Sequence, residues 1–173
     1  MTQDTPNSAN SVNSANTANS PSTAAASTTA GDIVQVSTVG AVRYITLNRT
    51  EAYNSLNQEL RLALIEAFRN AQKDSKELGS AVRAVVLRAN GKAFCSGQDL
   101  NEQLQDTQNR TGIEKVVEEY NPMVEQLTGI SVPTIAALQG PAAGAGWGLA
   151  MACDFRVMST APPSRGPSRA GSY

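Results

Sequence analysis

The chain has 173 residues, of which 40% are hydrophobic and 17% are charged, and its formal net charge is −1. It contains no histidine, which excludes a Ser-His-Asp or Cys-His nucleophile and any zinc site with a histidine ligand. The two cysteines, Cys95 and Cys153, are too few for a zinc site or a secreted disulfide scaffold. The near-neutral charge and the lack of a long apolar run predict a cytoplasmic protein with neither a nucleic-acid nor a membrane partner.

The two ends of the chain differ in composition from its middle. Residues 1–30 consist almost entirely of Asn, Ser, Thr and Ala, with Asn at every third position from Asn7 to Asn19. Such a segment cannot bury enough apolar surface to offset the entropy lost on ordering, so we predict a disordered tail. Residues 161–173 are rich in Pro, Gly, Ser and Arg and form a second tail of different composition. The predicted folded domain is therefore 31–160.

Predicted strands and helices alternate through this domain. Two runs rich in β-forming residues, 33–37 and 42–47, flank Val39-Gly40 and predict a hairpin. Apolar residues at helical spacing then predict an amphipathic helix over 57–73. The alternation indicates an α/β fold with a largely parallel sheet. The remaining predicted elements are strands at 83–88, 134–138 and 155–158, helices that begin near Ile113 and at Asn121-Pro122, and a short apolar helix at 149–152.

A glycine-rich segment, Gly140–Gly148, follows the predicted strand at 134–138. Its spacing fits neither the dinucleotide fingerprint nor the phosphate loop, so a nucleotide-binding module is the weakest of our hypotheses. Small residues at a helix start let a ligand approach unpaired backbone amides, which can stabilise an oxyanion. Tight packing of the helix on the sheet is the alternative explanation of the glycines. A second loop of the same character, Cys95–Leu100, favours two amides that converge on one carbonyl oxygen.

Six short stretches of sequence form a characteristic set, because of their order and their spacing along the chain. They are Leu47–Arg49, Asn54–Leu56, Ala84–Leu87, Phe94–Leu100, Pro133–Ala137 and Gly140–Asp154. Over about residues 31–160 this set resembles the enoyl-CoA hydratase/isomerase (crotonase) family. The glycine-containing runs most resemble the branch that isomerises ring-1,2-epoxyphenylacetyl-CoA. The resemblance implies an α/β, crotonase-like ββα spiral, which we expect to be truncated at its C-terminal end.

The resemblance also implies the roles of residues in the two loops. In the family, two backbone N–H groups form an oxyanion hole for the thioester oxygen, and the matching positions here are Gln98 and Ala145. The implied partner is an acyl-CoA thioester, with CoA as part of the substrate, no metal and no other cofactor. Full-length family members form trimers or hexamers. The implied substrate-binding residues are Ala52, Tyr53, Gln98, Asp99, Leu100, Asn101, Gly144 and Trp147.

Several polar and aromatic residues have a structural alternative. We expect Asp99 to cap backbone amides rather than to act as a base. Trp147 either lines the acyl pocket or packs in the core. Both cysteines are expected to be small buried side chains rather than nucleophiles. Glu118 and Glu119 are expected on a solvated helix face.

The chain departs from the family at its acidic positions. Gly148 stands where the hydratases carry a glutamate, which favours isomerisation over hydration. No Asp or Glu follows Asp154, so the chain lacks an evident catalytic base. A one-base frameshift after Thr160 is a hypothesis that accounts for the tail at 161–173. The predicted function is that of an enzyme of this family acting through an enolate, and the alternative is a catalytically inactive, truncated fragment that binds CoA thioesters or another partner.

Overall fold

The computed structural model describes residues 32–77, 81–109 and 112–160, and both predicted tails lie outside these ranges. A five-stranded sheet of order β1-β2-β3-β4-β5 forms its centre. β1 pairs antiparallel with β2, and each later neighbour pairs parallel, which confirms the predicted hairpin and the largely parallel sheet. The strands are β1 (Val34–Val39), β2 (Val42–Leu47), β3 (Ala84–Ala89), β4 (Thr134–Leu138) and β5 (Phe155–Met158).

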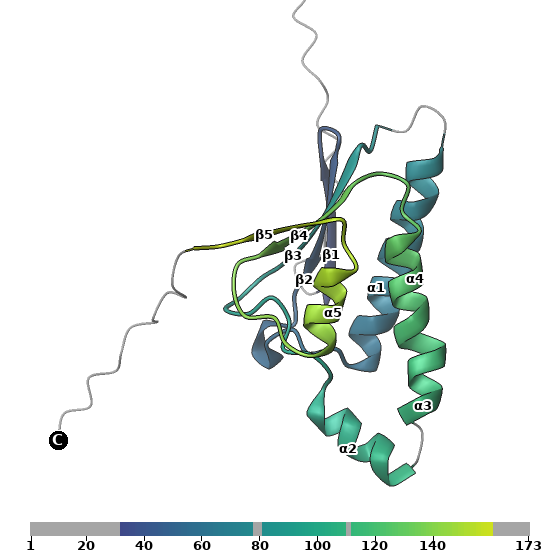
Figure 1. The fold of residues 1–173 in the computed structure, drawn as a ribbon, viewed down its shortest axis with the longest axis vertical. Coiled ribbons are helices and arrows are strands. Elements are labelled where there is room, and N and C mark those ends of the chain that lie inside the picture. Colours follow the sequence, from purple (N-terminus) through teal and green to yellow (C-terminus); the bar gives the residue numbers. More distant parts are fainter. Residues whose placement is uncertain (1–31, 78–80, 110–111, 161–173) are drawn as a thin grey trace, which may run out of the picture.

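Two helices, α1 and α4, cover one face of the sheet. Helix α1 (Gln58–Lys76) starts after Asn57, whose side chain accepts a hydrogen bond from the N–H of Leu60 and so caps the helix. It packs beside α4 (Asn121–Thr128), and α2 lies beyond one end of the sheet (Figure 1). No described helix combines the length and hydropathy that a membrane span requires. The other helical segments are η1 (Thr50–Ala52), α2 (Leu100–Asn109), α3 (Gly112–Lys115), η2 (Val116–Tyr120) and α5 (Ala145–Met151).

The two faces of the sheet are buried to different extents. On the helix-covered face, the in-register residues Ile45, Leu87 and Ala136 are fully buried and pack in one cluster with apolar residues of α1 and α4. On the opposite face, Val86 and Ile135 are only partly buried. The core therefore lies between the sheet and these helices. It fixes the carboxyl ends of β3 and β4, where the two glycine-containing loops begin.

The helical region after residue 112 differs from the prediction. The sequence predicts a helix that begins at Asn121-Pro122, and α4 does begin at Asn121. It does not start after a loop, however, because Asn121 has right-handed helical angles (φ −63°, ψ −50°) and lies inside a continuous helical run. The run passes from α3 through a π-helical turn, η2, into α4. In that turn the N–H of Asn121 donates to the carbonyl of Val116, five residues earlier. The wider turn accommodates Pro122, which lacks an N–H and would clash inside a regular α-helix.

Candidate functional site

The loops that follow β3 and β4 meet through two glycines. Gly97 and Gly144 both have a positive φ, of 102° and 50°. A Cβ added to Gly97 would lie 2.9 Å from the carbonyl oxygen of Ala143 and 3.5 Å from the backbone nitrogen of Ala145. A Cβ added to Gly144 would lie 3.9 Å from the Cα of Gly97. This close approach of two backbones leaves no room for a side chain at residue 97.

The residues that follow these glycines, Gln98 and Ala145, carry the two predicted amides. A parallel bridge pairs Leu56 with Gln98 through the flanking residues: Leu56 N–H donates to the Gly97 carbonyl at 2.8 Å, and Asp99 N–H donates to the Leu56 carbonyl at 3.4 Å. In this pattern the N–H of Gln98 points away from Leu56. Within the described part of the chain, the N–H groups of Gln98 and Ala145 donate to no carbonyl. Both amides therefore remain available to an acceptor.

A second contact joins the same two loops closer to the core. Cys95 forms a parallel bridge with Ala142, and its carbonyl accepts a hydrogen bond from Ala143 N–H at 3.0 Å. A Cβ added to Gly146 would lie 2.5 Å from that carbonyl oxygen and 2.6 Å from the Cys95 sulfur. Burial raises the pKa of the Cys95 thiol to about 11, and Cys153 is also buried. Both cysteines therefore pack rather than react, as predicted.

Asp99 ties its loop to the segment before α1. Its Oδ2 accepts hydrogen bonds from Arg49 Nη1 at 2.6 Å and from the Ser55 hydroxyl at 3.1 Å. Its Oδ1 accepts from the backbone N–H of Asn101 at 3.1 Å and of Glu102 at 3.3 Å, at the start of α2. The predicted capping role is confirmed, and the cap explains a helix that the sequence analysis does not include. The hydrogen bond from Arg49 lowers the pKa of Asp99, so the side chain is a carboxylate and a weak base.

A cavity of about 430 Å³ lies between that segment and α2. Asn54 supports one of its edges: its buried side chain donates to the carbonyls of Asn90 and Ala93 and accepts from the N–H of Arg49. These bonds hold Asn54 and the exposed Tyr53 at positive φ, a strained conformation for both. Six residues predicted to bind substrate line this cavity, namely Ala52, Tyr53, Gln98, Asp99, Leu100 and Asn101.

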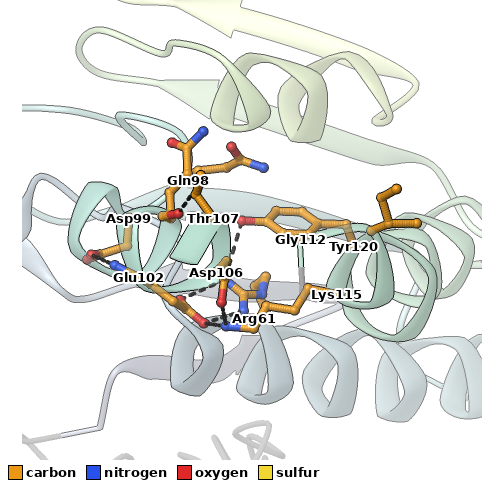
Figure 2. Close-up of a pocket in the computed structure, with 11 residues that line it drawn as sticks. Arg61, Gln98, Asp99, Glu102, Asp106, Thr107, Gly112, Lys115 and Tyr120 are labelled. Carbon is orange, nitrogen blue, oxygen red and sulfur yellow. Dashed lines mark hydrogen bonds and ion pairs between the residues drawn. The ribbon is translucent and has the colours of Figure 1, made fainter. Parts of the chain in front are cut away.

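A second cavity, also of about 430 Å³, lies on the other side of Gln98 and Asp99, between α2, α3 and Tyr120 (Figure 2). Its floor is Arg61 of α1, which is only 1% exposed. The guanidinium donates from Nη2 to Glu102 at 2.8 Å and lies 4.7 Å from the centroid of the Tyr120 ring. The hydroxyl of Tyr120 accepts from Arg61 Nη1 at 3.3 Å.

Glu119 completes this group. It is 7% exposed, and its Oε2 accepts from Arg61 Nε at 2.7 Å. The prediction that this residue lies on a solvated face is therefore wrong, whereas Glu118 is exposed as expected. The physical reason is that the buried cation on α1 requires an anionic partner, and the π turn directs Glu119 toward it. Arg61 itself could have been found from the sequence, because it interrupts an apolar stripe that contains Leu64 and Phe68.

The predicted residues of the second loop lie apart from both cavity walls. Gly144 and Ala145 lie where the loops meet and line neither cavity. From the sequence, Trp147 is expected either to line the acyl pocket or to pack in the core. It is 41% exposed, which contradicts the core position, and it lines neither of the two cavities. A Cβ added to Gly148 would meet no atom within 4 Å. A side chain at residue 148 would therefore fit without displacing the loop.

The sequence profile of the enoyl-CoA hydratase/isomerase family matches residues 37–165. The chain belongs to this family. It is 40% identical over 114 residues to the "Probable enoyl-CoA hydratase" of Rhodobacter capsulatus, a match that covers 65% of this chain and 40% of the relative. It is 38% identical to the 1,2-epoxyphenylacetyl-CoA isomerase of Escherichia coli, with 67% of this chain and 43% of the relative covered.

Solved structures of the enoyl-CoA hydratase/isomerase family share the fold. An enoyl-CoA hydratase/carnithine racemase from Magnetospirillum magneticum superposes with a TM-score of 0.67 at 31% identity, covering 73% of this chain and 46% of the other. An enoyl-CoA hydratase from Mycobacterium smegmatis gives 0.66 at 34% identity, with 73% and 48% covered. The predicted crotonase-like fold is confirmed. The chain spans less than half the length of these relatives.

Proposed function

We propose that the chain binds acyl-CoA thioesters and that the N–H groups of Gln98 and Ala145 hold the thioester oxygen as it becomes an enolate. The observation that supports this is the contact between Gly97 and the Gly144 loop. It brings the following residues, Gln98 and Ala145, close together, and their N–H groups donate to no carbonyl of the described residues. Two backbone donors aimed at a developing oxyanion lower the reaction barrier by several kcal/mol, because they need no reorganisation. No metal or redox group takes part in this step.

The two cavities suggest how the substrate lies. Gln98 and Asp99 line both of them, so a thioester carbonyl at Gln98 would have CoA on one side and the acyl group on the other. We place the CoA portion in the cavity beside Ala52 and Tyr53, and the acyl group in the cavity beside Arg61. The chemistry is then confined to the carbon atoms next to the thioester.

Within this family we favour isomerisation over hydration. Hydration needs a group that delivers water to the double bond, and Gly148 supplies no side chain for this. Isomerisation removes a proton from one carbon and returns it to another, so it needs a base as well as an oxyanion hole for the enolate between the two steps. The carboxylates that line the cavity beside Gln98 are those of Asp99, Glu102 and Asp106, and one of these would have to carry the proton. The names of the relatives do not decide the choice, since one is a 1,2-epoxyphenylacetyl-CoA isomerase and another a probable enoyl-CoA hydratase.

A second candidate is binding of CoA thioesters without turnover. The carboxylates around Gln98 are engaged: Asp99 bonds Arg49, and Glu102 bonds Arg61 and Lys115. The pKa of Asp99 is lowered by its hydrogen bond with Arg49, and the hydrogen bonds from Arg61 and Lys115 lower that of Glu102 despite its burial. Lowered pKa values make these groups weak bases.

One assay separates the candidates. Isomerisation of 3-hexenoyl-CoA raises the absorbance of the conjugated thioester, whereas hydration of 2-hexenoyl-CoA lowers it. We expect the first signal and not the second, together with saturable binding of hexanoyl-CoA by calorimetry. Binding without either signal favours the second candidate, and no binding contradicts both.

The oxyanion hole has its own matched pair of variants. Gly97→Ala places a methyl group 2.9 Å from the Ala143 carbonyl, and we expect it to weaken hexanoyl-CoA binding by about tenfold or more. Gly40→Ala carries the strain of a positive φ with no atom within 4 Å, and should bind like the parent chain. Equal binding by both variants would contradict the proposed position of the amides.

A further inference from the structure

We infer that Arg61 is a positioning residue for the oxyanion hole, and that its guanidinium fixes the direction of the Gln98 N–H through the backbone of Leu56. This inference rests on the proposed function, in which that N–H holds the thioester oxygen. Arg61 belongs to α1 and is only 1% exposed, so its side chain is packed into the protein beneath the site. Its contacts reach the segments on both sides of Gln98.

The direction of the Gln98 N–H is set by a hydrogen bond of the preceding residue. The carbonyl of Gly97 accepts from the N–H of Leu56 at 2.8 Å. In a trans peptide this carbonyl and the N–H of the next residue point in opposite directions, so the bond turns the N–H of Gln98 away from Leu56. On the other side of Gln98, Asp99 N–H donates to the Leu56 carbonyl at 3.4 Å. A rotation of the Leu56 backbone would therefore also rotate the amide of Gln98.

Arg61 holds the carbonyl of Leu56. Its Nη1 donates to this oxygen at 2.6 Å, whereas the Tyr120 hydroxyl and the Asp99 N–H lie 3.4 Å from it. The short bond has a charged donor, and such bonds are about twice as strong as those between neutral groups. Leu56 is fully buried, so water does not compete for its carbonyl. The guanidinium is therefore the main polar anchor of this backbone.

Carboxylates from two other elements fix the guanidinium itself. Its Nε donates to Glu119 Oε2 at 2.7 Å, and its Nη2 donates to Glu102 Oε1 at 2.8 Å (Figure 2). Glu102 lies in the first turn of α2, four residues after Gln98. One planar fork thus joins Leu56, which pairs with Gln98, to the helix that follows it. The peptide that carries the Gln98 N–H is held between these two attachments.

Two probes of similar size separate this role from a contact with the acyl group. Hexanoyl-CoA carries the thioester carbonyl, and S-hexyl-CoA is the thioether that lacks its oxygen. A residue that only contacts the acyl chain or supports the fold changes the affinity for both probes, and their ratio stays the same. A residue that directs the Gln98 N–H changes the ratio. Calorimetry on the whole parent chain should show about tenfold tighter binding of hexanoyl-CoA than of S-hexyl-CoA.

Arg61→Lys keeps the positive charge beside the carboxylates, but an ammonium group has no planar fork. The preference for hexanoyl-CoA should fall to about threefold or less, while the affinity for S-hexyl-CoA changes by less than about twofold. Phe68→Leu is the matched control, because Phe68 is fully buried on the same helix, about two turns further from Leu56. It should weaken the fold and leave the preference unchanged. A preference that survives Arg61→Lys, or that falls equally in Phe68→Leu, would overturn the inference.

The double variant Arg61→Met/Glu119→Leu repeats the test without a guanidinium and without an unpaired carboxylate at residue 119. It should lose the preference even though its stability recovers relative to Arg61→Met, which a purely structural role of Arg61 does not explain. It also replaces Arg61→Lys if far-UV circular dichroism shows that this variant does not fold, and a preference that it retains would overturn the inference. Equal binding of the two probes by the parent chain would instead contradict the proposed function, because the amides would then not hold the thioester oxygen.

Discussion

Two regions of the molecule meet at Gln98, the junction of the two glycine-containing loops and the cavity beside Arg61, and they are built in opposite ways. The junction of the two loops is made of backbone, with Gly97 and Gly146 pressed against carbonyl groups of the other loop. The second cavity, whose floor is Arg61, is made of side chains, with a buried guanidinium held between carboxylates. An added side-chain atom should destabilise the junction, because the two backbones are already in contact. Removal of one charged side chain should destabilise the cavity wall, because the oppositely charged partner then stays buried without a counter-charge.

The largest expected effect is the loss of the buried cation. Arg61→Met leaves the buried Glu119 without its cationic partner and takes one of two cations from Glu102. It should lower the free energy of unfolding by about 3–5 kcal/mol, measured by urea denaturation. Arg43→Met breaks the more exposed pair with Asp74 and should cost at most about 1 kcal/mol.

The double variant Arg61→Met/Glu119→Leu provides a further check on the same group. Replacing both partners by apolar side chains should recover part of the loss, because the unpaired carboxylate is then gone. If Arg61→Met and Arg43→Met lower the free energy of unfolding by the same amount, the burial of Arg61 adds nothing to the effect of its loss.

A smaller effect with a change of sign is expected within α5. Gly146→Ala forces a methyl group against the carbonyl and sulfur of Cys95 and should destabilise the fold by about 1–3 kcal/mol. Gly148→Ala, two residues later, meets no atom within 4 Å and should stabilise it by about 0.5–1 kcal/mol through helix propensity. Thermal unfolding measures the change in melting temperature of each variant. If both variants shift it in the same direction, the junction at Gly146 is not tightly packed.

The smallest expected effect is a dependence of stability on pH. The folded-state pKa of Asp99 is lowered, chiefly by the hydrogen bond from Arg49, so this carboxylate stabilises the fold above its unfolded pKa of about 4. That contribution is lost as the pH falls through the lower, folded pKa. Unfolding followed between neutral pH and about pH 3 should show a shallower acid loss in Asp99→Asn than in the parent chain. Parallel curves would mean that Asp99 is not coupled to folding.

Local pattern was enough for much of the fold. Apolar spacing predicts α1, the turn at Gly40 predicts the hairpin, and short apolar runs predict the strands to within about one residue at most ends. These features depend on near neighbours in the chain, and their side chains show the periods of helices and strands. The family is identified in another way, from the residues of six runs and their order along the chain, and this resemblance is confirmed.

Contacts between distant residues account for the rest. Nothing near Glu119 in the chain reveals that Arg61, 58 residues earlier, lies against it. The π turn that carries Pro122 inside a helix, and the helix that Asp99 caps, also depend on such packing. Whether a charge is buried, and which backbones touch, follow from how α1, α2 and the two loops meet in space. The alternation of apolar and polar residues fixes which face of each element is buried, but not which partner it meets there.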